Sequence, residues 1–166
     1  MLDPNTPRTI TLIGGGGFIG RHAVEALLKH NVRLRIAERN PKSAHTLMPL
    51  SKPGQIALVP ADLTRPATIE RAVEGADAVV NLVGTFDVAQ QRALHVEGAG
   101  RAAELAKEAG AKRAVLLPVS PDTVTVLPST RLPRVCSVTV IRFTASWEGV
   151  SCPIELLRKL ATKSGA

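Results

Sequence analysis

Five glycines stand within the seven residues Gly14–Gly20 (GGGGFIG), between an apolar run and an amphipathic one. Glycine at positions 14, 17 and 20 gives the spacing G-x-x-G-x-x-G, which is typical of loops that bind the pyrophosphate of a dinucleotide. Gly14 would allow a tight turn, Gly17 a close approach of the backbone to the phosphates, and Gly20 the packing of a helix on a sheet. Backbone N–H groups at the start of that helix would hold the anion. The alternative is a flexible turn that binds no ligand.

The residues after the next apolar run would choose between NAD and NADP. Glu38 can accept hydrogen bonds from a ribose 2′-hydroxyl, whereas Arg39 can pair with a 2′-phosphate. Arg21 and Lys42 add positive charge close by in the sequence. The pattern therefore favours NADP(H) over NAD(H). The alternative is that Glu38 and Arg39 form a solvated ion pair and contact no cofactor.

Two further strand ends carry candidate cofactor contacts. Asp62 follows the third predicted strand and could accept a hydrogen bond from an adenine amino group, with the Leu63 backbone beside it. An Asx-turn or a helix cap is the alternative for Asp62. The fourth predicted strand ends in polar and small residues, where Gly84 would let the backbone run close to a ribose; an ordinary strand end is the alternative. The candidates on this strand are Asn81, Leu82, Val83 and Gly84.

Other side chains that could do chemistry are isolated in the sequence. His95 lies in a predicted helix, and a lone histidine is more often structural than a ligand. The other histidines have no metal-ligand spacing relative to it, so we predict no metal site. Cys136 and Cys152 are too few for a disulfide framework and have no metal-ligand spacing, which favours a reducing compartment. The Cys136 thiol has no candidate base nearby, so a catalytic cysteine is not expected.

Strand and helix patterns alternate up to about residue 118. Runs rich in β-branched residues predict strands, and apolar residues spaced three and four apart predict helices. Thr64 is a plausible N-cap, and Gly110 a plausible end of the longest helix. The strands are predicted at 8–13, 32–37, 55–60, 77–83 and 113–118, and the helices at 18–30, 66–74 and 89–109, with a short helix within 40–50.

Alternating strands and helices with short connections predict an α/β fold, a Rossmann-like doubly wound parallel sheet. We assign residues 1–120 to an NAD(P)-binding Rossmann domain. Residues 121–166 lose the alternation and form an irregular C-terminal segment of the same domain. Within it, 135–143 could add a sixth strand and 154–162 a short helix. The fold is therefore expected to be truncated or altered at its C-terminal end.

Composition narrows the class of protein. A chain of 166 residues with 45% apolar and 21% charged residues suits one globular domain. No apolar run approaches the roughly 20 residues of a membrane helix, and the first residues do not resemble a secretory signal. The net charge of +7 invites a nucleic-acid ligand, but three Phe, one Trp and no Tyr offer little surface for stacking bases. An anionic dinucleotide or an acidic partner explains the charge equally well.

Three segments resemble atypical short-chain dehydrogenases/reductases of the extended, NAD-dependent epimerase-like type. They are ITLIGGGGFIGRHAVEALL, ADLTRPATIERAVEGADAVVNLVG and HVEGAGRAAELAKEAGAKRAVLL. The resemblance covers roughly residues 8–120. It is strongest to the subgroup that contains the NADPH-binding Rossmann accessory subunit of respiratory complex I.

The resemblance has its own implications for the site. It implies cofactor contacts at Phe18 and Ile19, besides the glycines, Arg39 and the residues at the third and fourth strand ends. It puts Ser120 where catalytic relatives carry an active-site Ser or Thr, and His95 near an Asn that supports their catalysis. Those relatives also use a Tyr-x-x-x-Lys pair for proton transfer. This chain contains no Tyr, so we assign no catalytic residue, and Ser120 is left as the weak candidate.

Together these observations predict a protein that binds NADPH in a structural or regulatory role. An active reductase or epimerase and a cofactor-free interaction module are the alternatives. The resemblance also implies a membrane-associated respiratory complex as a partner. It further implies a place in the cytoplasm or on the mitochondrial-matrix side, either soluble or at the periphery of the inner membrane. Direct nucleic-acid binding is not expected.

Overall fold

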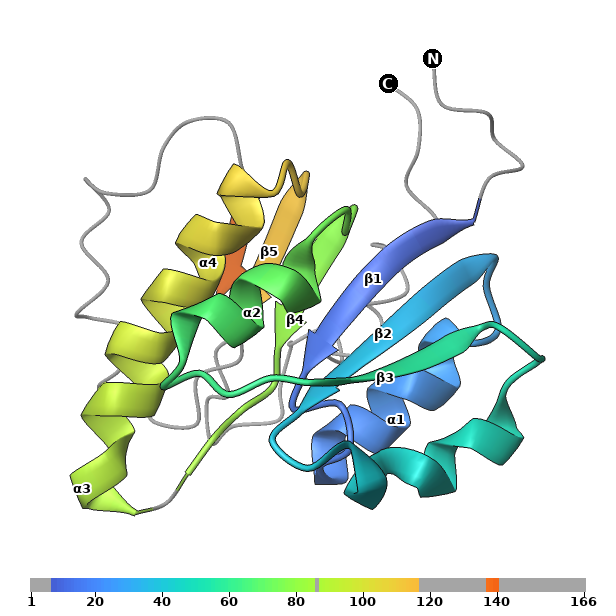
Figure 1. The fold of residues 1–166 in the computed structure, drawn as a ribbon, viewed down its shortest axis with the longest axis horizontal. Coiled ribbons are helices and arrows are strands. Elements are labelled where there is room, and N and C mark those ends of the chain that lie inside the picture. Colours follow the sequence, from blue (N-terminus) through green and yellow to red (C-terminus); the bar gives the residue numbers. More distant parts are fainter. Residues whose placement is uncertain (1–6, 86, 117–136, 141–166) are drawn as a thin grey trace, which may run out of the picture.

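The computed structural model describes residues 7–85, 87–116 and 137–140. Parallel strands alternate with helices that cover both faces of one sheet (Figure 1). The strands are β1 (Arg8–Ile13), β2 (Val32–Glu38), β3 (Ile56–Pro60), β4 (Ala78–Asn81), β5 (Arg113–Leu116) and β6 (Ser137–Val140). The helical segments are α1 (Phe18–Leu27), the 3₁₀ segment η1 (Pro41–Leu50), α2 (Pro66–Val73), α3 (Val88–Gln91), the π-helical segment η2 (Arg92–Gly98) and α4 (Ala99–Glu108).

The sheet has the strand order β3-β2-β1-β4-β5-β6, and every neighbouring pair is parallel. This is the Rossmann order, in which the chain reverses direction across the sheet between β1 and β4. Ligands of such sheets bind beyond the carboxyl ends of the strands at that reversal. The fold class predicted from the sequence is confirmed.

Two apolar clusters fix the helices to the two faces of the sheet, because successive strand residues point to opposite sides. Leu12, Leu34 and Val80 belong to the cluster that includes the buried residues of α1 and η1. Ile13 and Val79 belong to the other cluster, which includes the buried residues of α2 and, from α4, Ala102 and Ala106. The layers thus hold the strand ends and their loops in fixed relative positions.

Local details differ from the sequence predictions. The N-cap of α2 is Arg65 and not Thr64, because the Thr64 hydroxyl donates to the Asp62 carboxylate at 2.8 Å instead. The predicted helix at 18–30 ends at Leu27, where the His30 N–H turns back to the Leu27 carbonyl. The predicted helix at 89–109 is a continuous helical run, but its middle is the π-helical η2. It ends before Gly110, which has a φ of +81°.

The C-terminal predictions are only partly covered by the described residues. β6 lies within the predicted strand at 135–143 and pairs in parallel with β5. The expected helix at 154–162, Ser120 and both cysteines lie outside the described residues.

Candidate functional site

A cleft lies at the carboxyl ends of the first four strands. Its volume is about 330 Å³, within the range of small-molecule sites. Strand ends, the glycine-rich loop and one face of the α3–η2 run supply its walls. The lining residues are Ile13, Gly14, Gly17, Ala37, Glu38, Arg39, Ala61, Asp62, Leu63, Leu82, Val83, Gly84, Thr85, Gln90 and Leu94.

The glycine-rich loop needs its glycines for steric reasons. Gly14 has a φ of +80°, and a Cβ there would lie 2.9 Å from Val83. A Cβ on Gly20 would overlap the carbonyl oxygen of Gly15. A Cβ on Gly17 would meet only the Gly14 carbonyl oxygen, at 3.3 Å. Gly20 is therefore required for the turn itself, whereas Gly17 leaves space on the cleft side.

The N-terminus of α1 opens onto this loop. Its N-cap, Gly17, makes no side-chain hydrogen bond, and its first turn holds no acidic residue. N–H groups in the first turn of a helix have no partner within the helix, and the helix dipole adds partial positive charge there. Together these features suit a phosphate.

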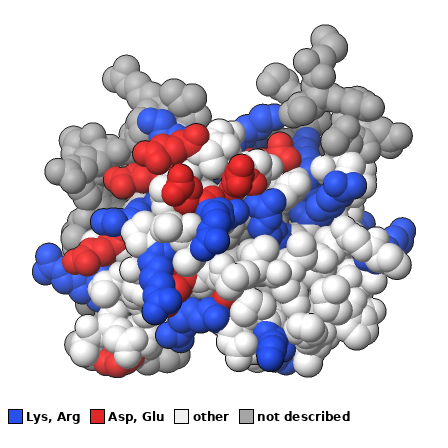
Figure 2. Space-filling model, viewed as in Figure 1, with Lys and Arg blue, Asp and Glu red and all other residues white. Residues whose placement is uncertain are grey.

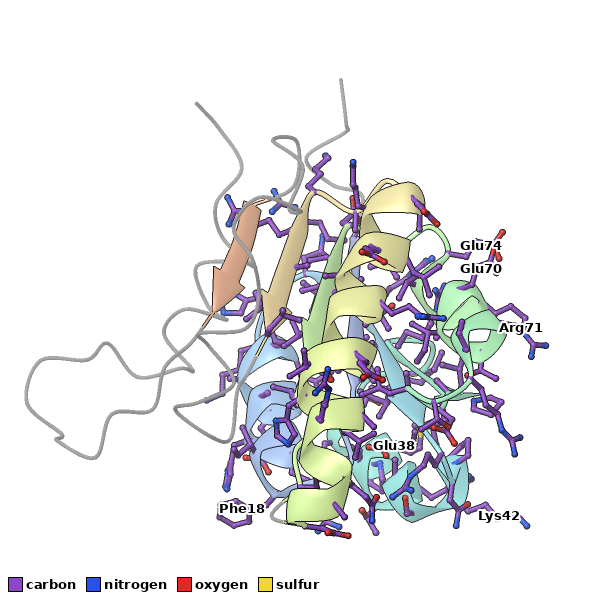
Figure 3. The ribbon with its side chains drawn as sticks, turned by 90° about the vertical axis from the view of Figure 1, so that its left-hand side faces the viewer. Phe18, Glu38, Lys42, Glu70, Arg71 and Glu74 are labelled. Carbon is purple, nitrogen blue, oxygen red and sulfur yellow. The ribbon has the colours of Figure 1, made fainter. Side chains whose placement is uncertain are left out.

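Glu38 contacts the glycine-rich loop directly. Its Oε1 accepts a hydrogen bond from the Gly16 N–H at 2.5 Å. In Figure 3, Glu38 lies among the loops at the end to which the strand arrows point, and the Phe18 ring lies at the outer surface of that end. The ion pair between Glu38 and Arg39 that was considered from the sequence is not formed among the described residues. Glu38 thus ties the end of β2 to the loop after β1.

Asp62 forms an Asx-turn and lines the cleft at the same time. Its Oδ1 accepts from the Thr64 N–H at 2.9 Å and from the Thr64 hydroxyl at 2.8 Å. The Thr64 backbone N–H lowers the pKa of the Asp62 carboxyl. Burial opposes this shift, and the charges of Arg39 and Arg65 support it. Asp62 is therefore a carboxylate at neutral pH.

The loop after β4 is held by two side chains. The Asn81 Oδ1 accepts from the Val83 N–H at 3.1 Å. The His95 Nε2 accepts from the Thr85 N–H at 2.9 Å, and His95 is only 4% exposed. These bonds place Val83, Gly84 and Thr85 along the cleft wall.

A family model described as NAD(P)H-binding matches residues 14–122, which is more than half of the chain. The chain belongs to this NAD(P)H-binding family. The matched residues begin in the glycine-rich loop and include all of the residues at the third and fourth strand ends that line the cleft.

Individual relatives of this NAD(P)H-binding protein are distant. "Ceramide reductase" of Caulobacter vibrioides is 28% identical over 106 residues, which are 62% of this chain and 32% of the relative. The 40 kDa subunit of mitochondrial NADH-ubiquinone oxidoreductase from Neurospora crassa is 29% identical over 99 residues, 58% of this chain and 26% of the subunit. The chain thus spans about a third or less of the length of these relatives.

Solved structures share the fold. One is a short-chain dehydrogenase/reductase superfamily protein from Agrobacterium tumefaciens with bound NAD, at a TM-score of 0.53 and 24% identity. The match covers 66% of this chain and 32% of that one. The resemblance to epimerase-like short-chain dehydrogenases/reductases and to the complex I subunit is thereby confirmed.

The structure brings most of the expected cofactor residues together around the cleft. Those that line it are Gly14, Gly17, Glu38, Arg39, Asp62, Leu63, Leu82, Val83 and Gly84. Phe18, Ile19, Gly20 and Asn81 do not line it. Phe18 is 83% exposed, whereas Gly20 and Asn81 are buried and shape the loops behind the cleft wall.

Sequence reasoning missed several lining residues. Ile13, Ala37 and Ala61 are apolar residues at or just past strand ends, and their positions could have been inferred from the predicted strands. Thr85 continues the predicted strand end. Gln90 and Leu94 come from the helical run, and only its packing against the sheet reveals them.

Two kinds of feature are absent from residues 7–85, 87–116 and 137–140. No group of three or more His, Cys, Asp or Glu side chains in these ranges could hold a metal ion. Over the same part of the chain, no helix is long and apolar enough to cross a membrane.

Proposed function

We propose that the chain binds NADPH in the cleft and holds it in a structural or regulatory role. The observation that carries the proposal is the cleft at the strand ends, which Gly14 and Gly17 line next to the N-terminus of α1. A Cβ on Gly17 would meet only the Gly14 carbonyl oxygen, at 3.3 Å. A dinucleotide fits the donor set. Backbone N–H groups suit its pyrophosphate, and Asp62 can accept from its adenine amino group. The cofactor, when bound, would supply a hydride donor.

The proposed arrangement follows the strand order. The adenine would lie near Asp62 and Leu63 at the end of β3, with its ribose near Glu38 and Arg39. The pyrophosphate would lie over Gly14 and Gly17. The nicotinamide half would extend past the loop after β4, along Val83, Gly84 and Thr85.

The preference for NADPH rests on Arg39. Its exposed side chain lines the cleft where the adenosine ribose would lie, and a guanidinium suits a phosphate. One oxygen of Glu38 is already occupied by the Gly16 N–H, which reduces its capacity to read a 2′-hydroxyl. The second Glu38 oxygen can still accept from the 2′-hydroxyl of NADH. Glu38 and Arg39 therefore favour different cofactors.

Calorimetric titration of the chain with NADPH and NADH tests this balance. We expect NADPH to bind more tightly. Arg39→Ala should lower the affinity for NADPH by about tenfold or more, because one charge-assisted pair is lost. The affinity for NADH should stay unchanged. Arg33→Ala serves as a matched control and should leave both affinities unchanged, because Arg33 is exposed on β2, the strand that Arg39 follows, and does not line the cleft. Equal binding of both cofactors, or tighter NADH, would overturn the preference.

The non-catalytic role rests on the sequence. The chain contains no Tyr, so it lacks the proton donor that catalytic relatives use. An active reductase or epimerase is the second candidate, favoured by the name of the Caulobacter relative. It predicts NADPH oxidation on addition of a carbonyl substrate and loss of that activity in Ser120→Ala. Turnover would overturn the structural role.

A respiratory complex is the proposed partner, on the strength of the Neurospora subunit. A place in the cytoplasm or on the matrix side, either soluble or at the periphery of the inner membrane, follows from that partner.

Figure 2 shows Lys and Arg interspersed with Asp and Glu on the face toward the viewer, which offers no continuous basic stripe for a nucleic acid. A cofactor-free interaction module would show no affinity for either dinucleotide.

A further inference from the structure

The π-helical segment η2 interrupts an otherwise α-helical run beside the cleft. It spans seven residues, Arg92–Gly98, between α3 and α4. π-turns are rare and are found frequently at functional sites. Leu94 lines the cleft directly, and two further residues of η2 contact the loops that form opposite ends of the cleft.

His95 is the contact to the loop after β4. Its ring is buried, and its Nε2 accepts from the Thr85 N–H at 2.9 Å. A neutral imidazole that accepts at Nε2 carries its proton on Nδ1, so this bond also selects the tautomer. Thr85 in turn accepts, through its hydroxyl, from the Asp87 N–H at 3.1 Å. His95 therefore fixes Thr85 within the loop that joins β4 to α3.

Gly98 is the contact to the loop after β3. A Cβ on Gly98 would lie 3.2 Å from the Leu63 Cβ and 3.0 Å from the Ala93 carbonyl oxygen. Both distances are shorter than ordinary van der Waals contact. Any side chain larger than a hydrogen would therefore press the helix and Leu63 apart. Leu63 is buried and lines the cleft next to Asp62.

We propose, on the basis of the dinucleotide binding proposed above, that η2 sets the width of the cleft at both ends. His95 is the positioning residue for the nicotinamide half, because it holds Thr85 in the wall after β4. Gly98 is the positioning residue for the adenine half, because it lets η2 approach Leu63. Neither residue lines the cleft, so each acts through the residue that it contacts.

Two ligands of different length separate the two roles. NADPH spans both ends of the proposed site, whereas ADP contains only the adenine half. We expect His95→Leu to lower the affinity for NADPH by about tenfold, which corresponds to the loss of one buried hydrogen bond. The affinity for ADP should stay unchanged. We expect Gly98→Ala to lower the affinities for NADPH and for ADP by similar factors.

Matched variants control for a general loss of stability. His95→Gln offers a side-chain carbonyl as an acceptor for the Thr85 N–H and should recover most of the NADPH affinity. Glu97→Gln changes the same segment at the Arg92–Glu97 pair, whose side chains are 87% and 66% exposed, and should bind like the wild type. Urea unfolding of each variant confirms that the titrated protein is folded.

The outcomes distinguish the two proposals. A wild-type chain that binds neither NADPH nor ADP contradicts the proposed function. If the wild type binds both ligands, an equal loss of affinity for NADPH and for ADP in His95→Leu contradicts the separate roles of His95 and Gly98. Wild-type affinities in folded His95→Leu and Gly98→Ala contradict the inference as a whole. A loss of affinity for NADPH but not for ADP in His95→Leu, with recovery in His95→Gln, supports the inference.

Discussion

At the scale of single residues, Gly17 and Gly20 lie three positions apart, but a methyl group has a different effect at each. The Cβ of Gly17→Ala would touch one carbonyl oxygen at 3.3 Å, and the backbone φ of −70° suits alanine. We expect this variant to fold with a loss of about 1 kcal/mol or less. Its dinucleotide affinity should fall about tenfold or more, since the methyl group occupies the gap proposed for the pyrophosphate.

Gly20→Ala is the contrasting variant. Its Cβ would overlap the Gly15 carbonyl oxygen, so the loop or α1 must shift. We expect the free energy of unfolding to fall by about 3 kcal/mol or more. Urea unfolding and calorimetric titration of both variants check the pair. Undiminished affinity in folded Gly17→Ala would show that the ligand does not approach this glycine.

The sequence predicts such site residues where a motif and a strand end coincide. The glycines, Asp62 and Gly84 follow predicted strands, and the ends of parallel strands share one edge of the sheet. The sequence did not predict the hydrogen bond between the Gly16 N–H and Glu38, because many donors in a folded chain can reach a carboxylate. Nor did it predict the bond between His95 and Thr85, which depends on how a distant helix packs.

At the scale of elements, α2 depends on contacts from the sheet. It has eight residues, and a helix so short is marginal by itself. The Arg35 guanidinium on β2 donates to the Ala72 and Glu74 carbonyl oxygens, both at 2.7 Å, and the buried Thr11 hydroxyl donates to Ala72 at 2.9 Å. A cation at a helix C-terminus also interacts favourably with the dipole.

Arg35→Met should therefore destabilise the fold through α2. The expected loss in free energy of unfolding is about 1–2 kcal/mol, measured by urea denaturation. Arg33→Met is the control on the same strand. Arg33 is exposed, and its substitution should stay within about 0.5 kcal/mol of the wild type. Equal losses in the two variants would show that the bonds to α2 do not stabilise it.

Elements were predictable where their apolar period is distinct. The bounds of β1 match the prediction, and β2 and β3 differ from it by one residue. The π-helical turn of η2 was not predictable, because its residues have the composition of an ordinary α-helix. The distinction between a 3₁₀ helix and an α-helix at Pro41–Leu50 was equally absent from the apolar pattern.

At the scale of the whole molecule, the cleft exists only when distant segments are assembled. Its walls come from the ends of β1 and β2, the loops after β1, β2, β3 and β4, and the α3–η2 run. The unfolded chain cannot reproduce this arrangement, so a dinucleotide should bind the folded state alone. Such binding stabilises the fold by mass action, by about 2.7 kcal/mol at a ligand concentration of 100 Kd.

For a domain of this size, that free energy corresponds to a rise of roughly 5–10 °C in the melting temperature. Thermal melts over a series of NADPH concentrations should show the midpoint rising with the logarithm of ligand concentration. Folded Gly17→Ala, with its weaker affinity, should need proportionally more NADPH for the same rise. A wild-type midpoint that stays constant at all concentrations would mean that NADPH does not bind the folded chain, and the interaction-module alternative would then take precedence.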